Sequence, residues 1–201
     1  MNTEGTFRLA FLVLLGLTVS MRIWFAIRVG WAGERLLPDR AAIRREGWKI
    51  FATRIFVFLL VVALIVLLDQ NPALWAKLEL RLPFWLRWAG FALGLASLGL
   101  WIWTHVVLGT LWSAQLELRA DHRLLPSGPY LLIRHPMYTA ILLWAFSLGL
   151  VIANWVPFIF AVGVAIILMA RVPREEQMMI EQFGGEYRVY MKKAGRFLPK
   201  W

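Results

Sequence analysis

The side chains best suited to chemistry lie in two short segments of a largely apolar chain. The first, residues 128–138, reads Gly-Pro-Tyr-Leu-Leu-Ile-Arg-His-Pro-Met-Tyr, and the second, residues 171–176, reads Arg-Val-Pro-Arg-Glu-Glu. Carboxylates accept hydrogen bonds from hydroxyl and ammonium groups, whereas arginine and histidine donate to carboxylates. The two segments together therefore suit a charged, water-soluble ligand.

A proline interrupts the first segment and fixes how its polar residues are presented. Pro136 has no N–H and disfavours helical geometry at His135, so a helix can begin at Pro136 but not run through it. Arg134 and His135 should then project from the mouth of a membrane helix, with Tyr138 one turn inside. Polar groups at such a depth are expensive and usually functional. The structural alternative is that the cations anchor helix ends near lipid phosphates and the two glutamates form a solvated face.

The elements that must position these residues are membrane helices. The chain has 201 residues, of which 60% are hydrophobic, and one span needs roughly 20 apolar residues. We therefore predict an all-α fold, a polytopic membrane helix bundle that forms a single domain over residues 1–201. About five transmembrane helices fit this length, and we expect them at residues 7–27, 50–68, 84–112, 138–153 and 157–170.

Several features of these spans carry further expectations. The last two are short and are joined by residues 154–156, which predicts a tight helical hairpin beside longer helices, with the polar site below the bilayer surface. Residues 69–83 are predicted to form a short loop.

His105 is expected to be an interfacial histidine, because no second histidine or carboxylate lies at metal-ligand spacing. The third span has small residues that would let another helix approach closely: Gly90, Gly94, Ala96, Ser97 and Gly99.

The carboxyl-terminal tail changes character after residue 170. Pro173 suits the first turn of a new helix, whose amino terminus the two following glutamates would favour. Gly184 and Gly185 should end that helix. Residues 186–193 should then form another helix with Tyr187, Tyr190 and Met191 on one face.

The charge distribution predicts an orientation. The formal net charge is +10, and most basic residues lie in residues 28–54, 113–137 and 171–201. The positive-inside rule then places the amino terminus outside, and the carboxyl terminus and both polar segments in the cytosol. Basic residues beside apolar spans report orientation rather than nucleic-acid binding. The chain has no cysteine, which excludes disulfides and thiolate metal sites, and its brevity favours a bacterial inner membrane.

The two segments together resemble a known family. The pattern Gly-Pro-Tyr-x3-Arg-His-Pro-x-Tyr, an apolar hairpin, and then Arg-x3-Glu-Glu-x6-Phe-Gly-x-Glu-Tyr-x2-Tyr resembles the isoprenylcysteine carboxyl methyltransferase family, which belongs with the phospholipid N-methyltransferases. The resemblance covers roughly residues 115 to 200, and His122-x-Leu124 before Ser127-Gly128 also matches it. Ala140 departs from the family, which usually has glycine there.

The resemblance implies an S-adenosyl-L-methionine (S-adenosylmethionine) cofactor. Residues 113–201 would form the cofactor-binding catalytic core, short cytosolic helices would complete its pocket, and residues 1–112 would supply three spans. The acceptor would be a lipid or other hydrophobic small molecule that enters from the membrane lipids, with no nucleic acid, metal or obligate protein partner. The implied cofactor contacts are His122, Leu124, Tyr130, Arg134, His135, Tyr138, Glu175, Glu176 and Tyr187.

Methyl transfer from a sulfonium is an in-line displacement at carbon that needs an aligned nucleophile in a dry site. A carboxylate nucleophile is already ionised at neutral pH and needs only a cation to hold it. We assign that role to Arg171, which Glu175 would position from one turn away. An amine nucleophile, as in a phospholipid amine N-methyltransferase, would instead need a proton acceptor, either Glu175 or Glu176.

Two other classes of protein stay open. Sterol-reductase-like membrane proteins have a similar carboxyl-terminal region and bind NADPH, although they are much longer. A non-enzymatic membrane scaffold would bind no cofactor. Binding of S-adenosylhomocysteine separates the methyltransferase from both.

Overall fold

The computed structural model describes residues 3–31, 52, 56, 71–109 and 127–200. Its elements, in chain order, are α1 (Thr3–Trp31), α4 (Pro72–Lys77), α5 (Phe84–Leu108), the 3-10 turn η2 (Gly128–Leu131), α6 (Pro136–Ile152), α7 (Trp155–Phe183) and α8 (Gly185–Lys193). Pairing between extended residues in this part of the chain is confined to two isolated bridges. The predicted all-helical fold is confirmed.

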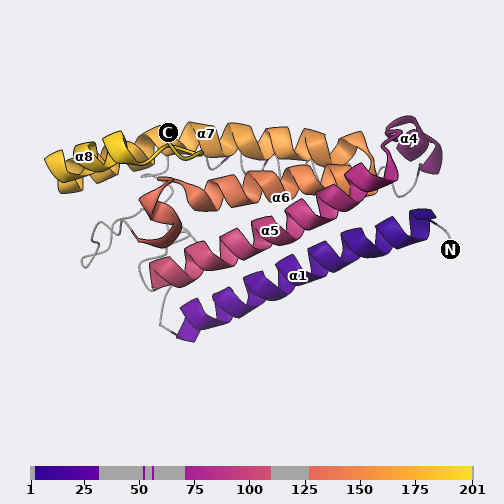
Figure 1. Cartoon of the computed structure of the whole chain (residues 1–201), viewed down its shortest axis with the longest axis horizontal. Coiled ribbons are helices and arrows are strands. Elements are labelled where there is room, and N and C mark those ends of the chain that lie inside the picture. Colours follow the sequence, from indigo (N-terminus) through magenta and orange to yellow (C-terminus); the bar gives the residue numbers. More distant parts are fainter. Residues whose placement is uncertain (1–2, 32–51, 53–55, 57–70, 110–126, 201) are drawn as a thin grey trace.

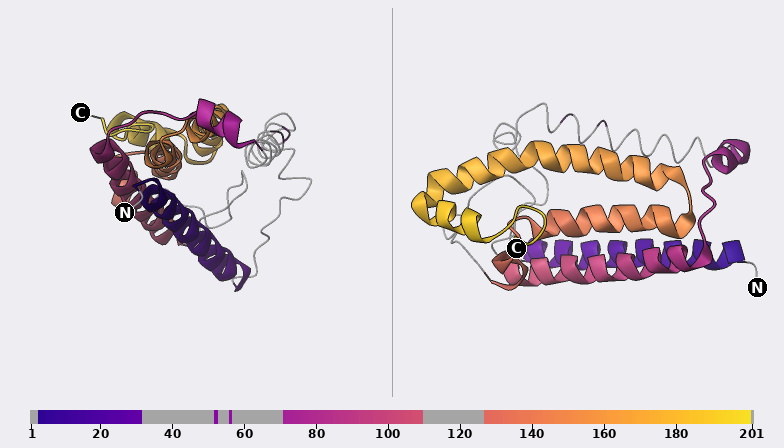
Figure 2. Two further views of the ribbon diagram at one scale, coloured as in Figure 1. Left: turned by 90° about the vertical axis from the view of Figure 1, so that its right-hand side faces the viewer. Right: turned by 45° about the horizontal axis from the view of Figure 1, so that its top comes forward.

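Among the described residues, four long helices make up the bundle. α1, α5, α6 and α7 run side by side along the long axis, with α4 at one end and α8 at the other (Figures 1 and 2). Three of them are long and apolar enough to cross a membrane, over Thr3–Arg28, Phe84–Leu108 and Trp155–Phe183, and α6 is a shorter apolar helix. Four predicted spans thus correspond to helices. The other, residues 50–68, lies almost wholly outside the described residues.

The core of the bundle lies between α1, α5 and α6. Its buried side chains include Phe7 and Leu14 of α1, Leu98 and Trp101 of α5 and Leu148 of α6. Apolar side chains at helical spacing place one stripe of each helix against its neighbours. The exposed faces of α1 and α7 also carry many large apolar side chains, as expected for helices that contact lipid.

Glycine permits the close contact of α5 with its neighbours, as predicted for part of the small-residue stripe. A Cβ at Gly90 would lie 2.5 Å from the Leu150 Cβ, and one at Gly94 would lie 2.8 Å from the Leu14 Cδ1. At Gly99 no atom of the described residues lies within 4 Å of an added Cβ, and Ala96 is exposed among them. The prediction was therefore wrong for these last two positions, which face away from the neighbouring helices because they lie on the other side of α5.

An ion pair fastens three helices at the end of the bundle near α4. The buried guanidinium of Arg87 donates to Glu4 at 2.6 Å and 3.1 Å and to the Val151 carbonyl at 3.0 Å. The same group lies 3.9 Å from the centre of the Phe7 ring. A buried charge is tolerated when it is paired and hydrogen-bonded, so this contact joins α1, α5 and α6.

The segment before α5 differs from the loop predicted there. It contains the short helix α4, whose first turn is capped because the Asn71 side chain accepts from the Leu74 N–H at 3.1 Å. Beyond α4 the chain pairs with the turn between α6 and α7, through Leu80 N–H to the Ala153 carbonyl at 2.7 Å. The tight hairpin itself is confirmed, with Ala153 at φ 51° and Asn154 capping α7.

Pro173 does not begin a helix, contrary to the prediction. α7 is continuous from Trp155 to Phe183 with Pro173 inside it. An interior proline loses its hydrogen bond to the carbonyl four residues earlier and its ring crowds that carbonyl, at a cost of about 3 kcal/mol. Burial of Val172 and Glu176 offsets this cost and keeps the chain helical around it. The consequence is functional, since Arg171 and Glu175 lie on one uninterrupted helix.

The end of α7 follows the prediction. Gly184 adopts φ 52°, a conformation that favours glycine, and terminates the helix. α8 begins directly afterwards, and the chain then returns to pair with residues just before α6, where Ile133 and Gly195 form a bridge. The carboxyl-terminal tail is thereby brought to the amino-terminal end of α6.

Candidate functional site

The amino-terminal end of α6 presents the first polar segment. η2 covers Gly128–Leu131, and α6 begins at Pro136 with His135 just outside it at φ −121°, as predicted. Gly128 has φ +56°, and a Cβ there would lie 2.9 Å from the Val107 Cγ2. η2 is therefore held tightly against α5. This contact fixes where the following residues, Arg134 and His135, leave the bundle.

Residues 194–197, which we term the carboxyl-terminal strap, lock these two residues in place. Arg134 N–H donates to the Gly195 carbonyl at 2.8 Å, and His135 N–H donates to the Arg196 carbonyl at 3.0 Å. The Thr139 hydroxyl donates to the Phe197 carbonyl at 2.7 Å. The two backbone N–H groups that precede α6 are thus bonded to the tail.

Glu176 is the centre of one half of the site. Its carboxylate accepts from the Arg134 Nε at 3.0 Å and from the Arg196 Nε at 3.2 Å, and the His135 Nε2 lies 3.5 Å away. Glu176 is only 5% exposed. A carboxylate buried this deeply needs compensation, and two guanidinium groups provide it. Arg134 in turn donates to the Met191 carbonyl at 3.0 Å and to the Ala194 carbonyl.

Glu175 is the centre of the other half. It accepts from the Arg171 Nε at 2.7 Å and from the Tyr138 hydroxyl, and the His135 Nδ1 lies 3.4 Å from its second oxygen. The His135 and Tyr138 rings are stacked with centres 5.5 Å apart. His135 therefore bridges the two carboxylates, one at each ring nitrogen.

The two glutamates decide the charge of His135. Burial on its own would lower the pKa of this imidazole, but the hydrogen bonds and charges of Glu175 and Glu176 outweigh burial and raise the pKa above its usual value. The protonated imidazolium is thus favoured, with a carboxylate oxygen 3.4 Å from Nδ1 and another 3.5 Å from Nε2. Three arginines and this histidine face two carboxylates, so the cluster has a net positive charge.

Three tyrosines border the cluster. The Tyr190 hydroxyl donates to the Tyr130 carbonyl at 2.6 Å, and the buried ring of Tyr187 lies 5.8 Å from that of Tyr190. Burial raises the pKa of all three hydroxyls, that of Tyr190 to about 12. They are neutral at physiological pH and act as hydrogen-bonding groups and aromatic walls rather than as bases.

The structure brings together six of the predicted site residues in direct contact. These are Arg134, His135, Tyr138, Arg171, Glu175 and Glu176. Tyr130 and Tyr187 lie beside them through Tyr190. His122 and Leu124 lie outside the described residues.

Arg196 is a member of the cluster that the sequence analysis missed. It is one of several basic residues in the tail, and no spacing distinguishes it from the others, because the fold alone places it against a glutamate twenty residues earlier. His105 is not part of the site. It packs against the rings of Phe25 and Trp101, and the described residues contain no group of three or more acidic or histidine side chains that could hold a metal.

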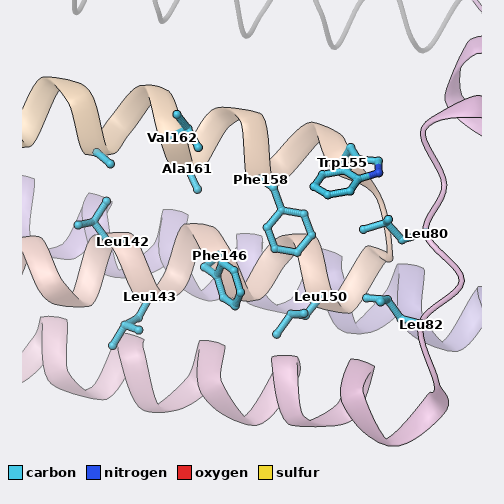
Figure 3. A pocket seen from close by; sticks show the side chains of 11 residues that line it. Leu80, Leu82, Leu142, Leu143, Phe146, Leu150, Trp155, Phe158, Ala161 and Val162 are labelled. Atoms are coloured by element: carbon cyan, nitrogen blue, oxygen red, sulfur yellow. The ribbon is translucent and has the colours of Figure 1, made fainter.

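A separate apolar cavity of about 710 Å³ lies between α6 and α7. It is lined by aliphatic and aromatic side chains, among them Leu142, Phe146, Trp155 and Phe158 (Figure 3). Another lining residue, Ala165, is six residues before Arg171 on α7, a rise of about 9 Å along a helix. The bundle thus offers a hydrocarbon-lined space within two helical turns of the polar cluster.

The arrangement is suited to a ligand that carries a positive and a negative group. Carboxylates accept hydrogen bonds from ammonium and hydroxyl groups, guanidinium groups hold a carboxylate, and tyrosine rings give flat apolar contacts. The Arg171–Glu175 contact provides a positioned cation at the membrane side of the cluster. No group in the cluster is a strong nucleophile, so the geometry favours binding and orientation of two reactants.

Comparison with known proteins identifies a family and a fold that parts of this chain resemble. Residues 91–181 match the model of the Isoprenylcysteine carboxyl methyltransferase (ICMT) family. A solved structure of the eukaryotic intramembrane Ras methyltransferase ICMT matches with a TM-score of 0.54 at 19% identity, over 82% of this chain and 54% of that one. The likeness shows that the two proteins share a helical membrane fold.

Curated relatives match over shorter stretches. Protein-S-isoprenylcysteine O-methyltransferase of Dictyostelium discoideum is 28% identical over 66% of this chain and 63% of its own length. The protein of that name in Schizosaccharomyces pombe is 30% identical over 39% of this chain and 34% of its own length. Cobalt-zinc-cadmium resistance protein CzcN of Cupriavidus metallidurans is 30% identical over 57% of this chain and 54% of its own length. The chain therefore spans between about one third and two thirds of the length of these relatives.

Proposed function

We propose that this chain, whose residues 91–181 belong to the isoprenylcysteine carboxyl methyltransferase family, transfers a methyl group from S-adenosylmethionine to a lipidic or other hydrophobic acceptor at the membrane. One observation carries the proposal. Residues from two motifs about forty positions apart, His135 and the Glu175-Glu176 pair, meet in one buried cluster at the end of an apolar helix bundle. Structural anchoring of helix ends requires no such convergence.

The residues present fit the proposed cofactor. Glu175 and Glu176 provide acceptors for ribose hydroxyls and the ammonium group, and Tyr138, Tyr130 and Tyr187 provide aromatic and hydrogen-bonding surface. His122 and Leu124 are further proposed contacts, together with the basic side chains Arg134 and His135. The cofactor supplies an electrophilic methyl group attached to a sulfonium.

Arg171 is the proposed acceptor-binding residue. It lies on α7 where the apolar part of the helix gives way to the polar cluster, and Glu175 fixes its guanidinium at 2.7 Å. A carboxylate acceptor is ionised at neutral pH and needs no base, so the chain's task is to hold both oxygens and exclude water. The planar guanidinium of arginine can donate two parallel hydrogen bonds to the carboxylate oxygens, and the carboxylate keeps its negative charge.

The family supports a carboxylate, and an amine is the rival acceptor. The relatives that share the family are named for methylation of isoprenylcysteine, so a lipid-linked carboxylate is the preferred acceptor for this chain. A phospholipid amine would reverse the roles, because the ammonium must lose a proton before it can attack and Glu175 would accept it.

Two substitutions on α7 distinguish these acceptors. If the acceptor is a carboxylate, Arg171→Lys keeps the positive charge but loses the paired N–H donors of the guanidinium. Single-turnover methyl transfer should then fall at least about tenfold, which is roughly 1.4 kcal/mol in the activation barrier. The affinity for the cofactor should stay near that of the parent. Arg174→Lys, an exposed position on the same helix, is the matched control and should behave as the parent. A fully active Arg171→Lys beside an inactive Glu175→Gln would reject the carboxylate and favour the amine.

The same assay reports the proposed orientation. The amino terminus of α1 lies at the α4 end of the bundle, away from α8 (Figure 1), and the basic tail favours the cytosolic side for the site. Methyl transfer from externally added cofactor should then proceed in sealed inside-out vesicles of a bacterial inner membrane. Transfer only in right-side-out vesicles would contradict this orientation.

A further inference from the structure

We infer that Arg196, on the carboxyl-terminal strap, binds the carboxylate of the amino-acid part of the cofactor. The inference rests on the proposed function, since it assigns one ligand group of S-adenosylmethionine to one side chain. The observation behind it is a contrast among the four cations of the cluster. Arg134, His135 and Arg171 are buried and engaged by protein groups, whereas Arg196 is engaged on one side only and has a side chain that is 48% exposed.

Arg134 and His135 are occupied by the protein itself. The Arg134 side chain is 7% exposed, and its Nε and Nη1 donate to Glu176 and to two backbone carbonyls. His135 has a carboxylate at each ring nitrogen. To bind an incoming carboxylate, either residue would first have to give up its contact with a buried carboxylate, and Arg134 would also lose its bonds to two backbone carbonyls, which is unfavourable.

Arg171 is excluded as the residue that binds the cofactor carboxylate, for a different reason. Its Nε is held by Glu175 and its side chain is 12% exposed. It lies at the end of the apolar part of α7, and in the proposed function it binds the acceptor. A second carboxylate on the same guanidinium would compete with that acceptor. The cofactor carboxylate therefore needs a cation of its own.

Arg196 has the geometry that this role requires. Its Nε and Nη2 both point to the Glu176 carboxylate, which fixes the plane of the guanidinium. Its Nη1 has no hydrogen bond to any of the described residues. Arginine has five N–H donors in a rigid fork, so one edge is held by Glu176 and the remaining donors stay open to a ligand. This preorganisation reduces the side-chain entropy lost on binding.

The position of Arg196 in the strap keeps it beside the site. Its backbone carbonyl accepts from the His135 N–H at 3.0 Å, and the next residue, Phe197, places its ring 6.0 Å from the His135 ring. The strap is held by the backbone bonds of Gly195 and by the Thr139 hydroxyl. Because these bonds do not involve the Arg196 side chain, a substitution there removes the guanidinium and leaves the strap in place.

The test compares two ligands that differ only in the carboxylate. S-adenosylhomocysteine and its decarboxylated analogue, which keeps the ammonium group, are titrated into the purified full chain and into Arg196→Gln, Arg196→Lys and Arg188→Gln. Arg188 lies exposed on α8 and controls for the loss of one charge. Arg196→Gln should weaken binding of S-adenosylhomocysteine by at least about tenfold, the usual scale for a lost charged hydrogen bond, and change binding of the analogue less than about twofold.

Each outcome has a distinct meaning. Arg196→Lys should retain part of the preference for the carboxylate ligand, because it keeps a charge but not the fork, and Arg188→Gln should match the parent. Equal weakening of both ligands by Arg196→Gln, or no weakening of either, would overturn the inference while leaving the proposed cofactor intact. A parent chain that bound neither ligand would overturn the proposed function, and this inference with it.

Discussion

At the scale of single residues, the site is a set of charges that compensate one another. Glu176 is held by two arginines and Glu175 by an arginine and a tyrosine, and His135 lies between the carboxylates. Such an arrangement keeps the two carboxylates paired although they are largely buried. The cations outnumber the carboxylates, and Arg196 is half exposed, so the cluster can still bind an anionic group of a ligand.

The raised pKa of His135 predicts a pH dependence of stability. A group whose pKa is higher in the folded state stabilises the fold fully below its ordinary value, near 6.5, and loses that contribution as the pH rises through the folded-state value. The thermal unfolding midpoint of the parent in detergent should therefore fall as the pH is raised above about 6.5. His135→Gln should start lower and decline less. Parallel curves for the two proteins would show that folding does not raise the pKa of His135.

Most of these residues could be predicted from the sequence, for a physical reason. The proline after His135 forces a helix to begin there, and the Glu175-Glu176 pair stands out in an apolar context. Arg196 could not be predicted in this way. Its role depends on the return of the chain after α8, which no local pattern encodes.

At the scale of elements, α5 and α6 form the tightest contact and Gly90 allows it. The Cβ of an alanine at this position would meet the Leu150 Cβ at 2.5 Å, and neither atom can move without shifting a helix. Overpacking of this kind typically costs about 1–3 kcal/mol, which exceeds the roughly 1 kcal/mol that alanine gains over glycine in a helix. Small residues at helix contacts matter especially in membranes.

Alanine substitutions at two glycines of α5 test whether this contact is close. Gly90→Ala should lower the thermal unfolding midpoint in detergent. Gly99→Ala, where the described part of the chain places no atom within 4 Å of the new Cβ, should leave the midpoint unchanged or raise it. Equal behaviour of the two variants would show that α5 and α6 do not pack closely at Gly90.

The helices themselves were predictable from hydropathy, but one boundary was not. Apolar runs fixed the positions of α1, α5, α6 and α7, and glycines fixed the end of α7. Pro173 predicted a break that the structure does not have. The general preference of proline for a first helical turn is overridden here by a helix that has already begun at Trp155 and is held by the buried side chains Val172 and Glu176. This continuity is what places Arg171 and Glu175 one turn apart.

At the scale of the whole molecule, an apolar bundle presents a polar cluster at one end. The exposed apolar faces of α1 and α7 suit lipid, and the cavity between α6 and α7 adds a hydrocarbon-lined space (Figure 3). Composition alone predicted the membrane bundle. It did not predict that α8 and the strap fold back on α6, because their polar contacts join residues about sixty positions apart.

The central claim is that this bundle binds S-adenosylmethionine, and calorimetric titration of the purified chain tests it most directly. S-adenosylhomocysteine, the product that remains after methyl transfer, is titrated in one experiment and NADPH in another. The account predicts saturable binding of S-adenosylhomocysteine at a single site and no binding of NADPH. Saturable binding of NADPH without binding of S-adenosylhomocysteine would contradict it.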